Sequence, residues 1–479
     1  MQKFDFFFTK KFLFLFVVAV AFIIFFHRLS EAPLSGDGIG YGEIAKEMAI
    51  TGDYLTPYHD GLPSFYTSKP PMLYWFSALS GNVFGFNNFS VKLPVAILAF
   101  LSIISMFLFV SKYYNFNVAF FTSIVLTFTQ QYMHHGRSCV TDGPFATFFI
   151  FALISFWVAN AEQKNLCYYL MSFFIGCAVM TKQVFGFIPF FVVFSYIIIA
   201  RDFKILKNYH FYLSFFIVPL IVLPWHILMY DKFGMKFINE YFLSTVNNIQ
   251  GWSPKQSYFS GIYIYINILI SNYQPWVLFF IYGVYIKFKN IKNIIISKKD
   301  IFILSWFFIP FVILHLVTQK NGNYLNALYP ASAIICAEVF NSFSQRIVKK
   351  IITILLILST ALCITYISFP IIPLTLDSQK LRDPMGLIQS VKTIDSKNKI
   401  IIRQDDWFVF SSLFLFYADR GNVTLDNSKF EQEFNSPKKY YFASYKDEFM
   451  NYLLSKYKNK INILCETKRT ILFTNENEK

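Results

Sequence analysis

Charged residues are scarce in this chain. Of its 479 residues only 15% are Asp, Glu, Lys or Arg, whereas 55% are hydrophobic and 61 are Phe. A soluble domain carries about 25% charged residues, and so much Phe cannot be buried in one water-surrounded core. The composition therefore excludes an ordinary globular enzyme and predicts a polytopic membrane protein.

Several familiar sequence signals are also missing. The 6 cysteines form neither a CxxC pair nor a Cys/His cluster, so the sequence indicates no disulfide framework and no zinc site. No Gly-rich phosphate loop is present, which argues against a nucleotide-dependent reaction, and no internal repeat supports a transporter built from inverted repeats. The formal net charge is +15. However, no basic stripe occurs together with a soluble binding motif, so we expect no nucleic-acid partner.

What the chain does contain is a long series of apolar runs. We expect about 11 of them to cross a bilayer as helices. The runs fall near residues 11–27, 91–111, 116–130, 144–160, 166–180, 184–200, 210–230, 262–286, 301–318, 324–343 and 350–370. No small-residue cleavage site follows the first run, so we predict an uncleaved anchor rather than a signal peptide.

Lys and Arg residues concentrate in alternate loops between these runs. If the N-terminus lies in the cytoplasm, the inside segments hold most of the basic residues, as the positive-inside rule requires. This orientation puts the long 28–90 loop on the outer face, together with the turns at 134–142, 181–183 and 319–323. The informative polar residues therefore converge on one side of the membrane.

The segment from Gly36 to Trp75 is the most distinctive part of the outer face. It is polar, rich in Gly, Pro and Tyr, and carries five acidic residues, Asp37, Glu43, Glu47, Asp53 and Asp60. Lipid cannot satisfy the backbone of a long non-helical segment, so this one is confined to the membrane surface or to a protein-lined cavity. Asp37, in the sequence SGDG, suits a general base or a group that orients an acceptor. It equally suits a helix N-cap.

Three further residues carry candidate chemistry, each beside a simpler interpretation. Asp142 in TDGP lies where a helix begins, which is ordinary capping chemistry, but it shares the outer face with Asp37 and could act with it. Lys69 in TSKPPMLYW suits a lipid phosphate or interfacial snorkelling. Lys182 in TKQ lies in a tight turn, and with Lys320 it could form a basic patch for an anionic lipid head. Residues that could join this patch are His134, His135 and Arg137.

Residues 371–479 differ from the rest of the chain in being richer in ionisable and amide side chains. Predicted strands cover 399–403, 439–445, 461–466 and 469–474, and predicted helices cover 384–396, 407–418 and 447–457. Strands and helices that alternate at this spacing predict a small α/β domain. We find no catalytic motif in it.

The order of these motifs resembles a known family. An Asp follows the first span, and then come YGEIAKEMAITGDYLTP, GLPSFYTSKPPMLYW, TDGP, TKQ and QKNGNYLNALYPA. The sequence is similar to the GT-C membrane glycosyltransferases of the protein mannosyltransferase type. It is most similar to the bacterial branch that transfers 4-amino-4-deoxyarabinose or related aminosugars to lipid A. The similarity runs over roughly 30–335, and the first loop is its most specific part.

The resemblance implies an architecture. It predicts an α-helical polytopic GT-C bundle of about 11–13 spans with juxtamembrane helices, within residues 1–370, in which 28–90 is the periplasmic catalytic loop. Residues 371–479 would be a small periplasmic α/β domain. The protein would lie in the bacterial inner membrane with its N-terminus in the cytoplasm.

The resemblance also implies substrates and site residues. The donor would be a sugar on a polyprenyl phosphate, usually undecaprenyl phosphate, and the acceptor would be lipid A or another glycan. No cofactor is certain, and a divalent cation is left open. The predicted catalytic residues are Asp37 and Asp142, and the predicted substrate-binding residues are Lys69, Lys182, Tyr41, Lys320, Tyr324 and Arg137.

The chain departs from the family's usual pattern at three positions. Gly38 stands where Glu usually follows the first Asp, Gly40 where Arg is common, and Ser68 where Glu usually precedes the KPP motif. The predicted site therefore has one cation and two carboxylates fewer than the usual pattern of the family. This leaves the choice of donor and acceptor open.

The expected reaction is a single inverting displacement at the anomeric carbon, with polyprenyl phosphate as the leaving group. Two alternatives are open. One is a transferase of the same fold that glycosylates protein or O-antigen. The other is a polyprenyl-lipid transporter or flippase, which would require charged residues inside the spans, whereas here nearly all charges lie at span ends.

Overall fold

The computed structural model describes residues 9–34, 36–65, 69–250, 262–292, 297–317, 320–369, 384–394, 398–404 and 407–475. These residues divide into two compact units. The helical unit comprises Met1–Leu29, Phe65–Leu73 and Leu93–Leu374, and the mixed unit comprises Ser30–Ser64, Tyr74–Lys92 and Thr375–Lys479. Each unit is described by itself below.

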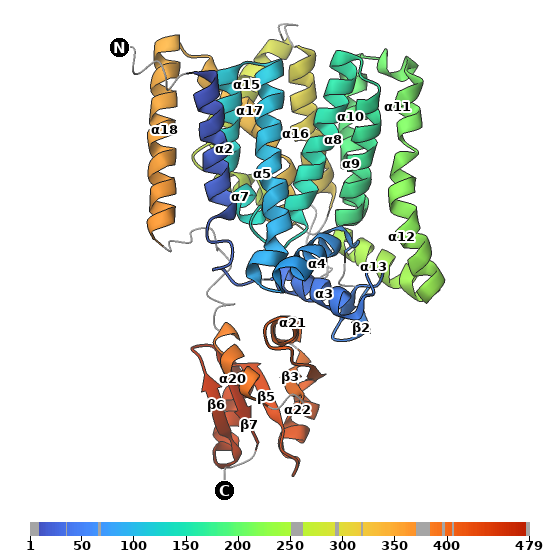
Figure 1. The fold of residues 1–479 in the computed structure, drawn as a ribbon, viewed down its shortest axis with the longest axis vertical. Helices are drawn as coiled ribbons and strands as arrows, with labels where there is room; N and C mark the ends of the chain where they lie inside the picture. Colours follow the sequence, from blue (N-terminus) through green and yellow to red (C-terminus); the bar gives the residue numbers. More distant parts are fainter. Residues whose placement is uncertain are drawn as a thin grey trace. The chain divides into compact units, whose positions relative to one another are not determined.

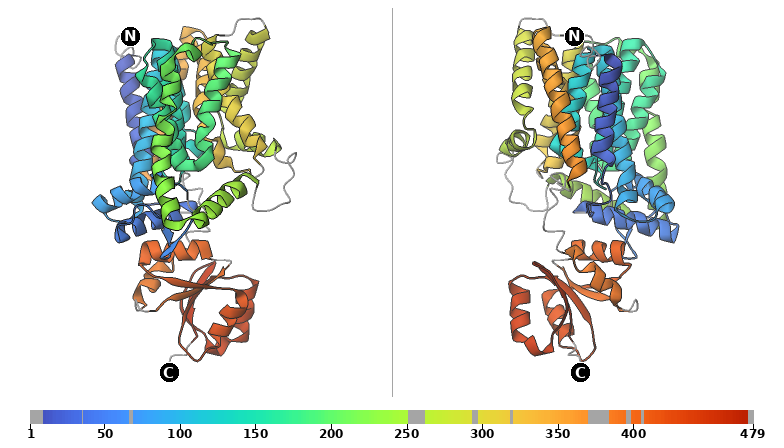
Figure 2. Two further views of the ribbon diagram at one scale, coloured as in Figure 1. Left: turned by 90° about the vertical axis from the view of Figure 1, so that its right-hand side faces the viewer. Right: turned by 60° about the vertical axis from the view of Figure 1, so that its left-hand side comes forward.

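Long helices that lie side by side build the helical unit (Figures 1 and 2). In chain order they are α2 (Lys10–Phe26), α5 (Asn88–Tyr113, whose first residues belong to the mixed unit), α6 (Phe116–Thr127), α7 (Gln130–His135), α8 (Asp142–Glu162), α9 (Leu166–Lys182), α10 (Ile188–Ile199), α11 (Tyr209–Ser214), α12 (Ile217–Phe233), α13 (Met235–Gln250), α14 (Ile262–Asn272), α15 (Val277–Lys292), α16 (Lys298–Leu316), α17 (Tyr329–Asn341) and α18 (Gln345–Ser368). Short 3-10 turns link several of them: η2 (Gln183–Phe187), η3 (Ile205–Lys207) and η4 (Gly322–Ala327).

Six helical stretches among the described residues are long and apolar enough to cross a membrane. They are Asn88–Tyr113, Asp142–Glu162, Leu166–Ile199, Tyr209–Phe233, Lys298–Leu316 and Gln345–Ser368. The predicted apolar runs are helical over most of their length, but α6 has only 12 residues and α17 only 13. The run predicted at 262–286 is divided between α14 and α15, at a segment that contains Pro275, which has no backbone N–H to donate.

Exposed apolar side chains mark the faces of the helical unit that suit lipid. Leu220 and Leu223 on α12 are exposed, as are Ile357 and Leu358 on α18. In water a surface of this kind would aggregate, whereas hydrocarbon is an equally apolar solvent for it. The interior is aromatic, and its largest fully buried side chain is Trp306, whose Nε1 donates to the Ala327 carbonyl oxygen at 3.1 Å.

The mixed unit contains a five-stranded sheet in the order β4-β3-β5-β7-β6. The elements here are α20 (Ile388–Thr393), β3 (Ile400–Arg403), α21 (Trp407–Ala418), β4 (Asn422–Leu425), α22 (Asn427–Phe434), β5 (Tyr441–Tyr445), α23 (Glu448–Lys456), η6 (Lys458–Lys460), β6 (Asn462–Glu466) and β7 (Thr470–Thr474). β3 pairs in parallel with β4 and β5, while β7 runs antiparallel to β5 and β6. The four predicted strands are present.

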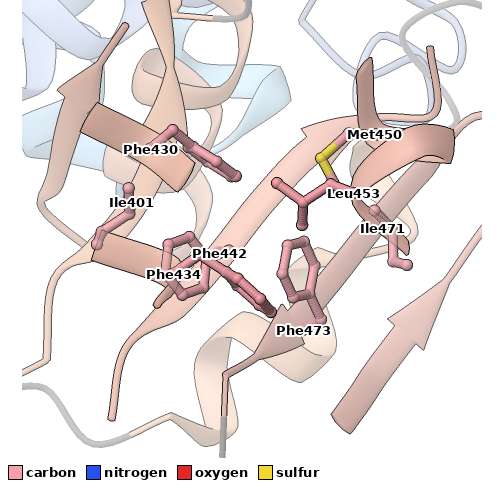
Figure 3. Close-up of a cluster of buried hydrophobic side chains, with 8 residues drawn as sticks. All are labelled: Ile401, Phe430, Phe434, Phe442, Met450, Leu453, Ile471 and Phe473. Carbon is pink, nitrogen blue, oxygen red and sulfur yellow. The ribbon is translucent and has the colours of Figure 1, made fainter. Parts of the chain in front are cut away.

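The sequence patterns do not predict β4 and α22. β4 is an edge strand of four residues, and α22 begins directly after it with Asp426 as N-cap, so neither segment is long enough to show a clear period. Tertiary packing reveals why α22 forms, because it buries Phe430 and Phe434 against the sheet (Figure 3). There Phe442 of β5 stacks on Phe473 of β7 with ring centroids 5.3 Å apart.

The first loop contains more helix than predicted. Its elements are α3 (Asp37–Thr51), the short strands β1 (Tyr58–His59) and β2 (Leu62–Pro63), and α4 (Met72–Phe84). The expectation of a non-helical segment is therefore wrong over α3, which ends at Gly52 in the left-handed conformation (φ 73°). β1 and β2 form a two-residue hairpin in which Asp60 (φ 51°) and Gly61 (φ 74°) both have positive φ, as Asp-Gly hairpins favour.

Two glutamates of α3 hold this hairpin. Glu43 is buried and its Oε2 lies 2.7 Å from Nδ1 of His59, while Oε1 of Glu47 accepts a hydrogen bond from the Gly61 backbone N–H at 3.0 Å. The two glutamates are four residues apart and so share one helix face. Burial and the neighbouring Glu43 raise the pKa of Glu47 to about 7. Burial lowers the pKa of His59, but the hydrogen bond and charge of Glu43 outweigh it, so the pKa of His59 is raised.

α3 also docks on α21 within the mixed unit. Lys46 of α3 donates to the carbonyl oxygens of Leu415 and Phe416, at 3.0 and 2.8 Å, and lies 2.5 Å from a carboxylate oxygen of Asp419. A cation at the carboxyl end of a helix satisfies carbonyls that have no intrahelical partner and opposes the helix dipole. A Cβ at Gly42 would lie 3.3 Å from the Phe416 ring, so the two helices approach closely at this glycine.

We predict that Lys46→Met loosens the end of α21. The change removes a charged donor from two carbonyls, and such hydrogen bonds contribute about 1.5–3 kcal/mol. Hydrogen–deuterium exchange of residues 410–419 should become faster. Lys429→Met is the matched control. The Lys429 side chain is exposed, and its ion pair with Asp426, at 3.6 Å and three residues away, is a surface pair that contributes little to stability. Equal exchange in both variants would contradict the docking role.

We also predict that the hairpin is held more weakly as the pH rises. Glu47 and His59 both have raised pKa values in the folded chain, so both stabilise the fold at low pH and lose that contribution as the pH rises through their folded pKa values, near 7 for Glu47. Amide exchange of residues 58–63, corrected for intrinsic rates, should show this loss between pH 5 and 8.5. Glu47→Gln mimics the protonated acid and should flatten the profile; an unchanged profile would refute the assignment.

Candidate functional site

A buried ion pair joins two helices of the helical unit. Asp142 is the first residue of α8 and Lys182 the last of α9, and a short turn makes these helices antiparallel neighbours. The amino end of α8 therefore meets the carboxyl end of α9. Nζ of Lys182 contacts Oδ1 of Asp142, and each residue is only 7% exposed. The capping interpretation of Asp142 is thus incomplete, because its carboxylate is engaged by a cation from another helix.

The turn after Lys182 is folded tightly back on α9. Gln183 has a positive φ of 53°, which is uncommon for a residue with a side chain. Gly186 has no room for a side chain, since a Cβ there would lie 2.2 Å from the backbone nitrogen of Val179. This geometry ends α9 abruptly and fixes Lys182 and Gln183 at the same end of the bundle.

η4 supplies a second side of the site. The ring of Tyr324 lies 4.6 Å from Nζ of Lys182, and Nδ2 of Asn326 donates to the Asp142 carbonyl oxygen at 3.3 Å. Phe145 of α8 adds another ring at 5.4 Å from the same ammonium. Lys182 is therefore held by one carboxylate and two aromatic faces, which favour a cation electrostatically.

Lys69 belongs to the same neighbourhood. It is within electrostatic reach of the Asp142 carboxylate. Upstream of it, Phe65 is fully buried, with ring centroids 4.8 Å from Phe233 and 5.6 Å from Phe237. The structure thus brings together four of the predicted residues within the helical unit: Lys69, Asp142, Lys182 and Tyr324.

Arg137 and Lys320 have other partners in the helical unit. Arg137 donates to the carbonyl oxygens of Ile24 and, at 2.7 Å, His27, and its guanidinium lies 5.3 Å from the Tyr366 ring. Lys320 donates to three carbonyls at the end of α16, those of Leu314, His315 and Val317. In this structure both cations stabilise helix ends rather than join Lys182.

Asp37 and Tyr41 lie on α3, in the mixed unit. Asp37 is exposed and is the first residue of the helix, and the residue at the N-cap position is Gly36. Tyr41 is buried, with its ring centroid 5.7 Å from that of Tyr74. Of the three departures from the family pattern, Gly38 and Gly40 are buried in α3, and Ser68 lies outside the described residues. That Asp37 acts with the Lys182 cluster stays a prediction.

Two polar residues of this site escaped the sequence analysis as functional candidates. Gln183 and Asn326 both occur inside quoted motifs, TKQ and YLNALYP, but an amide beside a charged residue gives no signal of its own. Within the described part of the chain, no group of three or more His, Cys, Asp or Glu side chains could hold a metal ion.

The buried pair generates a stability prediction. Removing one partner leaves an uncompensated buried charge, which costs about 3–5 kcal/mol, whereas removing both is often neutral. Asp142→Asn and Lys182→Met should each lower the thermal midpoint of the detergent-solubilised protein, and the double variant should recover most of the loss. Additive losses in the double variant would show that the two charges are not coupled.

Comparisons with known proteins show what this chain is similar to. Residues 68–228 match the family model described as dolichyl-phosphate-mannose-protein mannosyltransferase. An uncharacterized protein of Aquifex aeolicus is 26% identical over 76% of this chain and 72% of its own length. An undecaprenyl phosphate-alpha-4-amino-4-deoxy-L-arabinose arabinosyl transferase of Shewanella sediminis is also 26% identical, over 69% of this chain. The chain covers 61% of that transferase.

Solved structures show the same fold. ArnT from Cupriavidus metallidurans in the apo state superposes with a TM-score of 0.80 over 97% of this chain and 98% of its own, at 15% identity. The archaeal oligosaccharyltransferase AglB from Archaeoglobus fulgidus gives 0.58 over 91% and 70%, at 14% identity. The predicted fold class is confirmed. Residues 68–228 thus match the family model described as dolichyl-phosphate-mannose-protein mannosyltransferase, in a polytopic membrane chain with the fold of ArnT.

Proposed function

We propose that this protein is an integral membrane glycosyltransferase that moves a sugar, most simply an aminosugar, from polyprenyl phosphate to lipid A at the periplasmic face. The observation that carries the proposal is the buried Lys182, paired with Asp142 and with Lys69 nearby. Relatives are named as undecaprenyl phosphate-aminoarabinose transferases, and ArnT bound to undecaprenyl phosphate shares the fold with a TM-score of 0.76.

The chemistry follows from charge. As the bond between the anomeric carbon and the phosphate oxygen breaks, negative charge develops on the polyprenyl phosphate. Lys69 and Lys182 are fixed cations suited to stabilise it in a water-poor site. Lys182 would exchange the Asp142 carboxylate for the phosphate, which frees Asp142 to orient the acceptor.

Asp37 is proposed to orient the acceptor or take its proton while the acceptor oxygen bonds to the opposite face of the anomeric carbon. A lipid A phosphate is already anionic and needs little base catalysis, whereas a hydroxyl acceptor needs more. Tyr41 and Tyr324 would line the substrate site. Arg137 and Lys320 would stabilise the helix ends around it through their hydrogen bonds to backbone carbonyls.

A second candidate acceptor is a protein. It is favoured by the fold shared with AglB, which was solved in complex with an inhibitory peptide and a dolichol-phosphate. A transferase that acts on protein or O-antigen would use the same cations for the donor and differ only at the acceptor.

The acceptor is tested by mass spectrometry of lipid A from a bacterial strain that carries this protein and from its deletion strain. We expect a lipid A species that is heavier by one sugar residue and disappears on deletion. Unchanged lipid A together with altered glycoprotein or O-antigen would replace the proposed acceptor by the second candidate.

The donor chemistry is tested by release of free polyprenyl phosphate from a polyprenyl-phosphate sugar by the purified protein. Lys182→Met should slow release about 100-fold or more. Asp37→Asn should slow it less than about 10-fold for a phosphate acceptor and about 100-fold or more for a hydroxyl. Lys429→Met, at an exposed position of α22, serves as the control. Lipid movement without any release would contradict a transferase.

A further inference from the structure

Helix α13 contacts both of the segments that carry Lys69 and Lys182, and the proposed reaction leaves it without a role. It follows α12 after a sharp turn at Gly234, where φ is 58°. Phe237 and Tyr241 lie four residues apart and therefore share one face of α13. Both side chains are buried, at 1% and 5% exposed.

Phe237 contacts the segment that leads to Lys69. Its ring centroid lies 5.6 Å from that of Phe65, and the two rings meet edge to face at 86°. The ring of Trp225 on α12 also lies 5.6 Å from that of Phe237. Aromatic pairs of this kind are favourable and have a preferred geometry. They therefore fix the Phe65 ring, shortly before Lys69 in the chain, against α12 and α13.

Tyr241 contacts the turn that follows Lys182. Its hydroxyl lies 3.2 Å from Nε2 of His226 on α12 and within hydrogen-bonding reach of the Gln183 side chain. Nδ1 of His226 lies 2.8 Å from the Val222 carbonyl oxygen, so a neutral imidazole carries its proton there and accepts through Nε2. The Tyr241 hydroxyl then donates to His226, and the Gln183 amide donates to the Tyr241 oxygen.

The position of Gln183 determines that of Lys182. Gln183 directly follows Lys182, and its backbone has a positive φ of 53°. A residue with a side chain keeps such a conformation only where its surroundings hold it there. A contact that holds the Gln183 side chain therefore also fixes the backbone from which Lys182 extends.

Two cations that bind one phosphate act well only when their spacing is set before the ligand arrives. Lys69 and Lys182 lie on segments far apart in the sequence, and α13 contacts both segments. We propose that Tyr241 and Phe237 are positioning residues, Tyr241 for Lys182 through Gln183 and Phe237 for Lys69 through Phe65. This inference rests on the proposed function, because it assigns to α13 the spacing of the two phosphate-binding lysines.

The first test measures the binding of undecaprenyl phosphate to the full-length protein in detergent. Tyr241→Phe removes only the hydroxyl and should weaken binding about 3- to 10-fold, as expected from the loss of one neutral hydrogen bond. Tyr169→Phe is the matched control. The Tyr169 hydroxyl also lies beside a histidine, 2.9 Å from Nδ1 of His210, but Tyr169 is near the start of α9, whereas Lys182 is at its end.

The control separates positioning from stability. Tyr169→Phe should lower the thermal midpoint about as much as Tyr241→Phe does, because each removes one tyrosine hydroxyl from a histidine. It should change lipid binding less than about 2-fold, because the site is distant.

The second test uses variants that lack one of the two lysines. In a Lys182→Met background, Tyr241→Phe should have no further effect on binding of undecaprenyl phosphate, because residues that act through one another are not additive. Gln183→Met together with Tyr241→Phe should likewise weaken binding no more than either change alone. Phe237→Leu should weaken binding in the unaltered chain and lose that effect in a Lys69→Met background.

Two results would overturn this inference and leave the proposed function intact. Equal effects of Tyr241→Phe and Tyr169→Phe on binding would show that the Tyr241 hydroxyl only stabilises the fold. Full effects of Tyr241→Phe and Phe237→Leu in the lysine variants would show that α13 does not act through these lysines. Failure of the unaltered protein to bind undecaprenyl phosphate would instead overturn the proposed function, and this inference with it.

Discussion

The buried pair of Asp142 and Lys182 is the constraint on which the helical unit's site depends. Two opposite charges are held away from water at a low cost only if each finds its partner in good geometry and further polar contacts are made there. The antiparallel packing of α8 and α9 meets this requirement, and η4 closes the site with Tyr324 and Asn326. An ion pair contributes little net stability when buried, which fits our proposal that Lys182 is held ready for the phosphate of the donor.

In the mixed unit, several contacts keep the polar first loop ordered. α3 carries Asp37 at its first position, and the same helix is held by the hairpin through Glu43 and Glu47 and by α21 through Lys46. The α/β residues at the C-terminus contain no catalytic motif, yet their helix α21 contacts α3 directly. Their role is therefore consistent with support of the acidic loop helix.

The similarity to ArnT illustrates what fold and sequence each convey. At 15% identity the superposition covers 97% of this chain, because long apolar helices tolerate almost any exchange of Leu, Ile, Val and Phe on their lipid faces. In the function that we propose, the chemistry instead depends on a few charged residues at helix ends. The glycines at positions 38 and 40 alter that set in the first loop, which is where a difference in substrate would arise.

The sequence by itself determined the membrane class, the helical runs, the four predicted strands and the motifs that contain Lys69, Asp142, Lys182 and Tyr324, because hydropathy, strand period and spacing are local properties. Tertiary structure alone decided that Asp142 faces Lys182, that Arg137 and Lys320 instead cap other helix ends, and that β4 and α22 form. The contacts of Asp142 and Arg137 join residues 40 to 184 positions apart, and no local pattern encodes a partner at that distance.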